Sequence, residues 1–141
     1  MKAADRKQLI EAARAAAMRA YAPYSRFRVG AALLGASGQV HTGFNVENVS
    51  YGLSMCAERT AMYGALLKGE KAFRALAIWT DSESPVSPCG ACRQVLVEFC
   101  GNIPVVLCAG RTGRTRSYTL RQLMPAAFFD FPGAGRHRKK P

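Results

Sequence analysis

The chain has 141 residues, of which 49% are hydrophobic and 21% charged, and its formal net charge is +11. This length and composition predict one globular domain with its own core and exclude a disordered or fibrous chain. No apolar run approaches the roughly 18 residues that cross a membrane, and the N-terminus lacks the apolar stretch of a secretory signal. Five cysteines, an odd number, favour a reducing compartment, so we expect a cytoplasmic protein.

The positive charge is concentrated in two places. Four basic residues fall in the last nine positions, 133–141, and a second group comprises Arg111, Arg114, Arg116 and Arg121. No aromatic residues alternate with these charges, as they would in a surface that stacks single-stranded nucleic acid. We therefore expect one folded domain over residues 1–132 and a basic, disordered tail over 133–141. Nucleic-acid binding is expected to be weak at most and confined to this tail.

The N-terminal third of the chain predicts a helix followed by a β-hairpin. Residues 5–20 carry apolar side chains at helical spacing, and Pro23 stops the helix. Residues 26–34 and 39–44 show the apolar alternation of strands, and the glycine-containing turn at 35–38 joins them.

A loop with two polar side chains follows the second strand. Asn45 and Glu47 are two positions apart, so in an extended chain their side chains face the same way. An amide beside a carboxylate could bind a diol such as a ribose. The same residues also suit an ordinary asparagine-rich turn. The local pattern favours neither interpretation.

The rest of the chain alternates between helices and strands. The pattern predicts helices at 56–68 and 89–99, buried strands at 73–79 and 103–108, a short strand at 117–120 and a helical turn at 121–124. Strands that alternate with helices predict an α/β fold, with a mixed sheet and helices on its faces.

Three cysteines stand at the starts of the two later helices. Cys56 opens one helix, and Cys89 and Cys92 open the other in a C-x-x-C pair. If these helix ends lie side by side, the three thiols meet at one edge of the sheet. Thiolates are zinc ligands, and a catalytic zinc takes three protein ligands and leaves the fourth place to water. We therefore expect one Zn²⁺ per chain.

Charged neighbours of these cysteines suit a catalytic site. Glu58 follows Cys56 closely enough to take a proton from a metal-bound water. Three thiolates leave a formal negative charge on the site, which the helix N-termini would offset. Arg59 and Arg93 could add hydrogen bonds to the sulfurs.

Other sites also contain a C-x-x-C pair. A structural zinc ribbon normally has a second such pair, whereas here the first half is a single cysteine followed by Ala57 and Glu58. A catalytic zinc is therefore favoured over a structural zinc or a thioredoxin-like dithiol. The remaining cysteines, Cys100 and Cys108, lie in apolar stretches and are expected to be buried free thiols.

C-A-E followed by P-C-x-x-C is typical of zinc deaminases, and over residues 9–129 the chain resembles the small homotetrameric cytidine deaminases. Four segments carry the resemblance: Pro23-Tyr24-Ser25 with Phe27 and Val29-Gly30-Ala31-Ala32, then Asn45-Val46-Glu47-Asn48, Cys56-Ala57-Glu58-Arg59-Thr60-Ala61 and Ser87-Pro88-Cys89-Gly90-Ala91-Cys92-Arg93-Gln94-Val95. Cysteine at position 56, where other members of the superfamily have histidine, matches the tetrameric class.

The resemblance implies a fold, a reaction and a metal. The fold would be a three-layer α/β/α sandwich around a mixed five-stranded sheet. The reaction would be hydrolytic deamination of cytidine and 2′-deoxycytidine to uridine and 2′-deoxyuridine, a step of pyrimidine salvage that releases ammonia. Cys56, Cys89 and Cys92 would hold the zinc, whose bound water attacks C4. Glu58 would pass protons from that water to ring N3 and to the leaving amine.

The resemblance also implies roles for other residues. Arg59 would offset the thiolate charge. The substrate-binding residues would be Phe27, Asn45, Glu47, Tyr51 and Ala57, together with Phe128 from a neighbouring subunit of a homotetramer. Phe129 and Phe131 compete with Phe128 for that role.

Two alternatives remain open. One is a related deaminase with another small substrate, such as the blasticidin S type, against which Asn45 and Glu47 argue. The other is a zinc-stabilised RNA-binding or RNA-editing protein, which the positive charge suggests.

Overall fold

The structure is a computed structural model, and it describes residues 1–128. The expected tail at 133–141 lies outside this part of the chain, as do Phe129 and Phe131. Among the described residues, no helix is long and apolar enough to cross a membrane.

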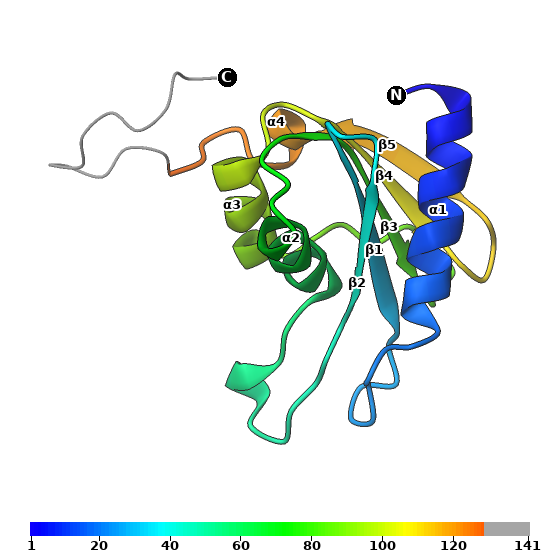
Figure 1. Cartoon of the computed structure of the whole chain (residues 1–141). Coiled ribbons are helices and arrows are strands. Elements are labelled where there is room, and N and C mark those ends of the chain that lie inside the picture. The colour runs from blue at the N-terminus through cyan, green and yellow to red at the C-terminus, as the bar shows by residue number, and fades with distance from the viewer. Residues whose placement is uncertain (129–141) are drawn as a thin grey trace, which may run out of the picture.

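A five-stranded mixed sheet forms the centre of the molecule (Figure 1). Its strands are β1 (Val29–Gly35), β2 (Val40–Phe44), β3 (Phe73–Thr80), β4 (Pro104–Ala109) and β5 (Thr115–Thr119), and they lie side by side in the order β2-β1-β3-β4-β5. β3 and β4 run parallel, and the other three pairs are antiparallel. The predicted hairpin and mixed sheet are both confirmed.

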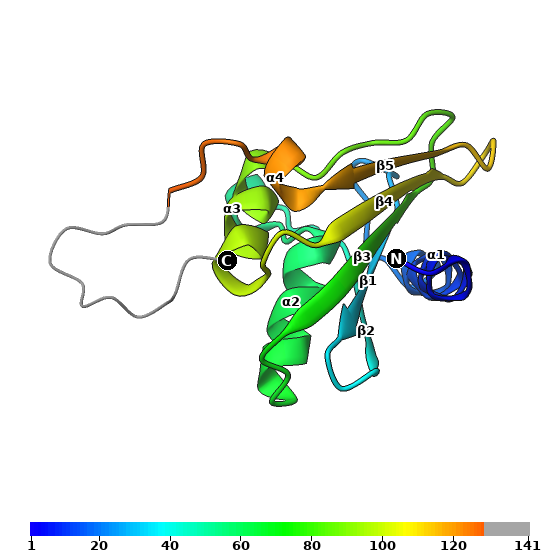
Figure 2. The same ribbon diagram turned by 90° about the horizontal axis from the view of Figure 1, so that it is seen from above.

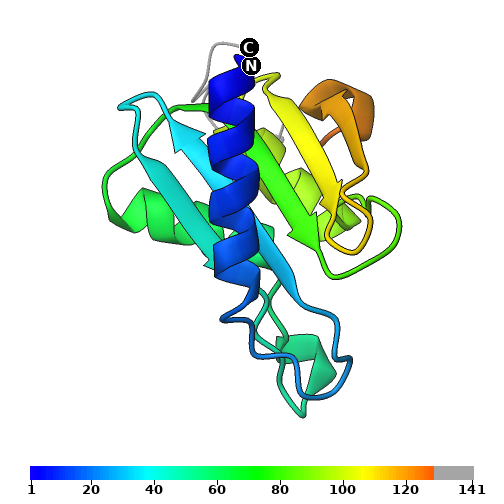
Figure 3. The ribbon, with the colours of Figure 1, turned by 90° about the vertical axis from the view of Figure 1, so that its right-hand side faces the viewer.

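Helices cover both faces of this sheet, as predicted (Figure 2). α1 (Ala3–Ala17) crosses one face, where Figure 3 shows it in front of the strands. α2 (Ala57–Leu67) and α3 (Gly90–Phe99) pack on the other. The core is divided accordingly: one cluster joins α1 to the sheet through Leu9, Ala77 and Trp79, and the other joins α2 and α3 to it through Met62 and Leu96. The layers are those of an α/β/α sandwich.

The predicted strand at 26–34 begins later, at Val29. The residues before it form a loop, because Arg26 adopts a left-handed φ of 57° that no strand permits. The first helix also ends earlier than predicted, at Ala17. Beyond it Tyr21 pairs with Val46 in an isolated bridge, which holds the chain extended.

Two short helical turns complete the described chain. α4 (Leu120–Leu123) starts at Thr119 in a capping box with Gln122, close to the predicted position. The 3₁₀ turn η1 (Tyr51–Leu53) was not predicted, since three residues around a glycine show no period. It lies at the tip of the long loop between β2 and α2 (Figure 1).

Candidate metal centre

The three cysteines meet where α2 and α3 begin. Cys56 is the N-cap of α2, Cys89 is the N-cap of α3, and Cys92 lies in the first turn of α3. Their sulfur atoms all lie within 4.8 Å of one another, and the Cys56 and Cys89 sulfurs are 3.9 Å apart. Sulfurs around a tetrahedral zinc, at about 2.3 Å from the metal, stand about 3.8 Å from each other. The donor set and its spacing therefore fit one zinc ion, as the sequence predicted.

Positive charge reaches this cluster from the side chain of Arg59. Its Nη2 lies 3.6 Å from the Cys56 sulfur, one turn along α2. Without metal, a hydrogen bond from Cys92, together with Arg59 and Cys89, lowers the pKa of Cys56 to about 5. The same hydrogen bond to the Cys56 thiolate, together with burial, raises the pKa of Cys92. Cys56 is thus the first thiolate of the site, and Arg59 stabilises it.

Glu58 is a buried carboxyl group next to these sulfurs. It lies in the first turn of α2 and is 5% exposed. Burial, with a smaller contribution from the Cys56 charge, raises the pKa of Glu58 to about 7. A carboxyl group with such a pKa exchanges protons readily near neutral pH, which is what a general acid and base must do.

Asn45 and Glu47 both face the loop before β1, which confirms that their side chains share one direction. The Asn45 amide spans this loop: its Oδ1 accepts from Val29 N at 2.9 Å and its Nδ2 donates to Phe27 O at 2.9 Å. Glu47 Oε2 accepts from the backbone N–H groups of Tyr24 and Ser25, at 2.9 and 3.2 Å. The Ser25 hydroxyl donates to Glu47 Oε1. These bonds lower the pKa of Glu47, the Ser25 hydroxyl contributing most.

These contacts give both residues a role that the sequence did not suggest. They fix the loop that carries Phe27, whose side chain is half-buried. A carboxylate has about four lone-pair sites, of which the loop occupies three, so Glu47 keeps acceptor capacity for a ligand. The sequence feature that could have indicated this role is Ser25, whose hydroxyl group in the motif Pro23-Tyr24-Ser25 is available to bind a carboxylate.

The other expected site residues lie at different depths. Ala57 is fully buried at the first position of α2. Tyr51, on η1, is 75% exposed and its ring stands edge-on to Tyr24 at 5.9 Å between centroids. Phe128, at the end of the described chain, is 62% exposed. Tyr51 and Phe128 therefore present large aromatic surfaces to solvent in the single chain.

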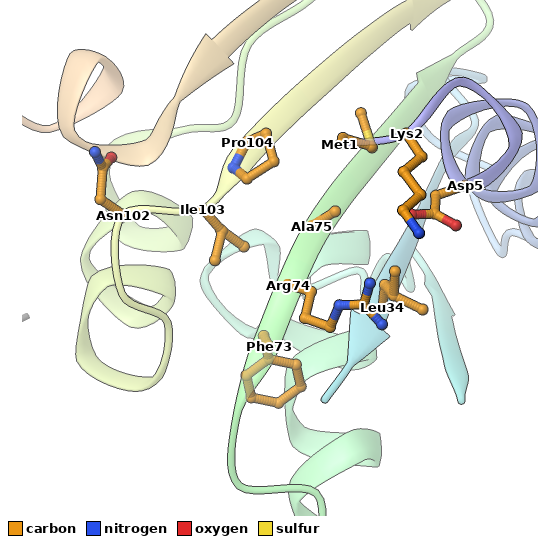
Figure 4. A pocket seen from close by; sticks show the side chains of 10 residues that line it. All are labelled: Met1, Lys2, Asp5, Leu34, Phe73, Arg74, Ala75, Asn102, Ile103 and Pro104. Carbon is orange, nitrogen blue, oxygen red and sulfur yellow. The ribbon is translucent and has the colours of Figure 1, made fainter. Parts of the chain in front are cut away.

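The cavity drawn in Figure 4 lies elsewhere. Its volume is about 370 Å³, and it is lined by the N-terminal ends of α1 and β3 and by the start of β4, including Lys2, Phe73 and Pro104. The metal-binding cysteines lie in the segments that follow the carboxyl ends of β2 and β3, whereas the cavity lies at the amino end of β3. The site is therefore identified by its chemistry, not by the volume of a cavity.

A profile of the cytidine and deoxycytidylate deaminase zinc-binding region matches residues 3–109. Two relatives, each named cytidine deaminase, are 48% identical to this chain. That from Sporosarcina psychrophila aligns over 88% of this chain and 91% of its own, and that from Halalkalibacterium halodurans over 88% and 94%.

Solved structures agree with these relatives. The crystal structure of cytidine deaminase from Burkholderia pseudomallei superposes with a TM-score of 0.83 at 47% identity, and covers 91% of this chain and 100% of that one. That of the Mycobacterium tuberculosis enzyme has a TM-score of 0.77 at 43% identity, with 89% and 98% covered.

Proposed function

The chain belongs to the cytidine and deoxycytidylate deaminase family, and we propose on this basis that it converts cytidine and 2′-deoxycytidine to uridine and 2′-deoxyuridine with release of ammonia. The observation that carries the proposal is the cluster of three thiols within 4.8 Å beside the buried carboxyl group of Glu58. The names of relatives 48% identical to this chain support the substrate class.

Cys56, Cys89 and Cys92 would hold one zinc ion, since their sulfurs lie within 4.8 Å of one another and those of Cys56 and Cys89 are 3.9 Å apart, close to the spacing around a tetrahedral zinc. Zinc lowers the pKa of a coordinated water to about 7 and so supplies a nucleophile at neutral pH. Arg59 donates toward the Cys56 sulfur and offsets part of the thiolate charge.

Glu58 moves the protons of the reaction. Its carboxylate takes a proton from the attacking water and delivers it to ring N3. It then carries the second proton to the amine that leaves C4, so that water and cytidine give uridine and ammonia. Its burial in the first turn of α2, two residues after Cys56, supports this role, because it places a proton-accepting group beside the metal-bound water.

The substrate would lie over the loop before β1. Phe27 packs against the base, and the backbone of Ala57 hydrogen-bonds it. Glu47 accepts from the ribose hydroxyls through its remaining acceptor capacity. Asn45 contributes to the ribose contact and fixes Phe27 through its bonds to the loop backbone. Tyr51 is the remaining substrate-binding residue of this chain.

The working form would be a cytoplasmic homotetramer in which Phe128 reaches a neighbouring subunit's site. The exposed rings of Tyr51 and Phe128 support an association between copies, since large apolar side chains at the surface often mark interfaces.

Turnover by the purified protein tests this proposal. We expect cytidine to be converted to uridine, followed by ultraviolet absorbance, with one zinc counted per chain on the same sample. Glu58→Gln should keep the zinc and lose activity by about a thousandfold or more, because its amide cannot transfer the protons. Zinc without cytidine turnover would contradict the proposal and direct the search to modified cytosines or RNA. Full activity in Glu58→Gln would contradict the role of Glu58.

A further inference from the structure

The two side chains that directly follow Cys92 both hydrogen-bond to the C-terminal segment, Arg93 to Leu123 and Gln94 to Phe128. Arg93 and Gln94 lie in the second turn of α3, whose first turn holds Cys92 and whose N-cap is Cys89. In the ribbon, α4 and the segment after it run beside α3 (Figure 2). The positions of these two residues thus connect the metal-bearing helix to the end of the described chain.

Arg93 bridges the segment just before Cys89 and the end of α4. Its Nε donates to Pro88 O at 2.7 Å, its Nη2 to Ser87 Oγ at 2.9 Å, and its Nη1 to Leu123 O at 2.8 Å. All three guanidinium nitrogens therefore donate to oxygens, and the expected bond to a sulfur is made by Arg59 instead. Pro88 directly precedes Cys89, so Arg93 holds the carbonyl group next to a metal ligand.

Gln94 holds the backbone of Phe128 at two points. Its Nε2 donates to Phe128 O at 2.7 Å, and its Oε1 accepts from Phe128 N at 3.3 Å. The side-chain amide thus pairs with both the N–H and the C=O of one residue, as a residue of a neighbouring antiparallel strand would. The Phe128 ring is nevertheless 62% exposed. The contacts thus fix the backbone that carries the ring while the ring itself stays available to another molecule.

We propose that Arg93 and Gln94 are positioning residues that tie the C-terminal segment to the zinc-bearing helix. Arg93 keeps the Ser87–Pro88 segment, and with it Cys89, in place for the metal. Gln94 sets the place from which the Phe128 ring projects. The inference concerns the same site and rests on the proposed function for its kinetic consequence, although its structural consequence does not depend on activity.

The experiment uses the full-length, zinc-loaded protein. Gln94→Met keeps the length of the side chain but removes both hydrogen bonds. Gln8→Met is the matched control, because Gln8 is an exposed glutamine on α1. Amide hydrogen exchange at Phe128 should become about fivefold faster in Gln94→Met, as expected for one lost hydrogen bond, and should not change in Gln8→Met. Equal exchange at Phe128 in Gln94→Met and the parent protein would overturn the assignment of Gln94.

Kinetics distinguish positioning from general stability. Gln94→Met should raise the KM for cytidine by several-fold while kcat changes less than about twofold and the zinc content stays at one per chain. A fall in kcat without a change in KM would contradict the assignment. If the parent protein does not deaminate cytidine, the proposed function fails. Hydrogen exchange still tests whether Gln94 holds the backbone of Phe128.

Arg93 is tested by the release of zinc to a chelator. Arg93→Lys keeps the charge, but its single ammonium group cannot bridge three oxygens in a fixed fork. We expect zinc to leave about tenfold faster from this variant than from the parent. Arg93→Met, which removes the charge and all three hydrogen bonds, is a second variant for the same measurement of zinc release. Zinc release at the parent rate in Arg93→Lys would overturn the assignment of Arg93.

Discussion

Gly43 on β2 lies against the backbone of α2 at Ala61: a Cβ built on Gly43 would stand 2.2 Å from the Ala61 nitrogen. No side chain fits in so small a gap, so the lack of a Cβ at Gly43 lets α2 approach the sheet closely. Cys56 and Glu58 are carried by the start of the same helix. The distance between β2 and α2 therefore helps to place the metal centre.

Gly43→Ala should destabilise the protein by about 3 kcal/mol or more, because overpacking a core typically costs about 1–3 kcal/mol and here the new Cβ meets helix backbone that cannot move aside. Displacing α2 should also weaken zinc binding. Urea unfolding with zinc quantification measures both effects. The matched control is Gly64→Ala on the open side of α2, where a Cβ would meet nothing within 4 Å. This control should raise the free energy of unfolding by about 0.5–1 kcal/mol. Equal effects of the two substitutions would contradict the close packing at Gly43.

Arg59→Gln should accelerate the loss of zinc. The guanidinium group lies beside the Cys56 sulfur and offsets the charge of the thiolates. Removing such a neighbour of a metal ligand typically costs 10–100-fold in metal affinity or activity. Transfer of zinc to a competing chelator gives the rate.

Arg114→Gln serves as control, because it removes the same charge from an exposed turn between β4 and β5. Equal rates for Arg59→Gln and Arg114→Gln would show that only the overall charge of the protein matters.

The metal centre could be predicted from the sequence because its ligands occupy local landmarks. Cys56 and Cys89 each stand at a helix start, and an α/β sheet brings such helix starts together. The contacts of Asn45 and Gln94 could not be predicted in this way. Asn45 bonds to the backbone 16 and 18 positions away, and Gln94 to the backbone 34 positions away. No local period encodes such pairs.

In the zinc-free protein, Glu58 should make stability depend on pH. Burial raises its pKa to about 7 in the folded chain, whereas an unfolded glutamate titrates near 4.5. Between these values the folded state binds more protons, so this group's contribution to the free energy of unfolding falls as the pH rises. Glu58→Gln removes this pH-dependent contribution to the free energy of unfolding, because glutamine does not titrate. Its stability relative to the parent should therefore increase from pH 5 to pH 8, by about 1.4 kcal/mol for each unit of pKa shift.

Urea unfolding of both zinc-free proteins in reducing buffer, at pH 5 and pH 8, measures this change. The comparison between the two proteins cancels titrations that they share. A constant difference between Glu58→Gln and the parent at the two pH values would show that Glu58 titrates normally.

Arg26 supplies the last prediction, because its backbone is strained within the loop that carries Phe27. Its φ of 57° lies in the left-handed region, which costs a residue with a Cβ about 1–2 kcal/mol. Glycine avoids this cost but loses about 0.5–1 kcal/mol through the entropy of the unfolded chain. Arg26→Gly should therefore raise the free energy of unfolding by up to about 1 kcal/mol, measured by urea unfolding of the zinc-loaded protein.

Arg26→Ala separates the backbone effect from the loss of the exposed side chain, since alanine keeps the Cβ and the strain. We expect it to change stability by less than about 0.5 kcal/mol, as exposed substitutions usually do. If Arg26→Gly is less stable than Arg26→Ala by about 0.5–1 kcal/mol, which is the cost of glycine with no strain relieved, position 26 is not left-handed in solution. The loop that Asn45 and Glu47 hold would then have another conformation, and the placement of Phe27 against the base would fail with it.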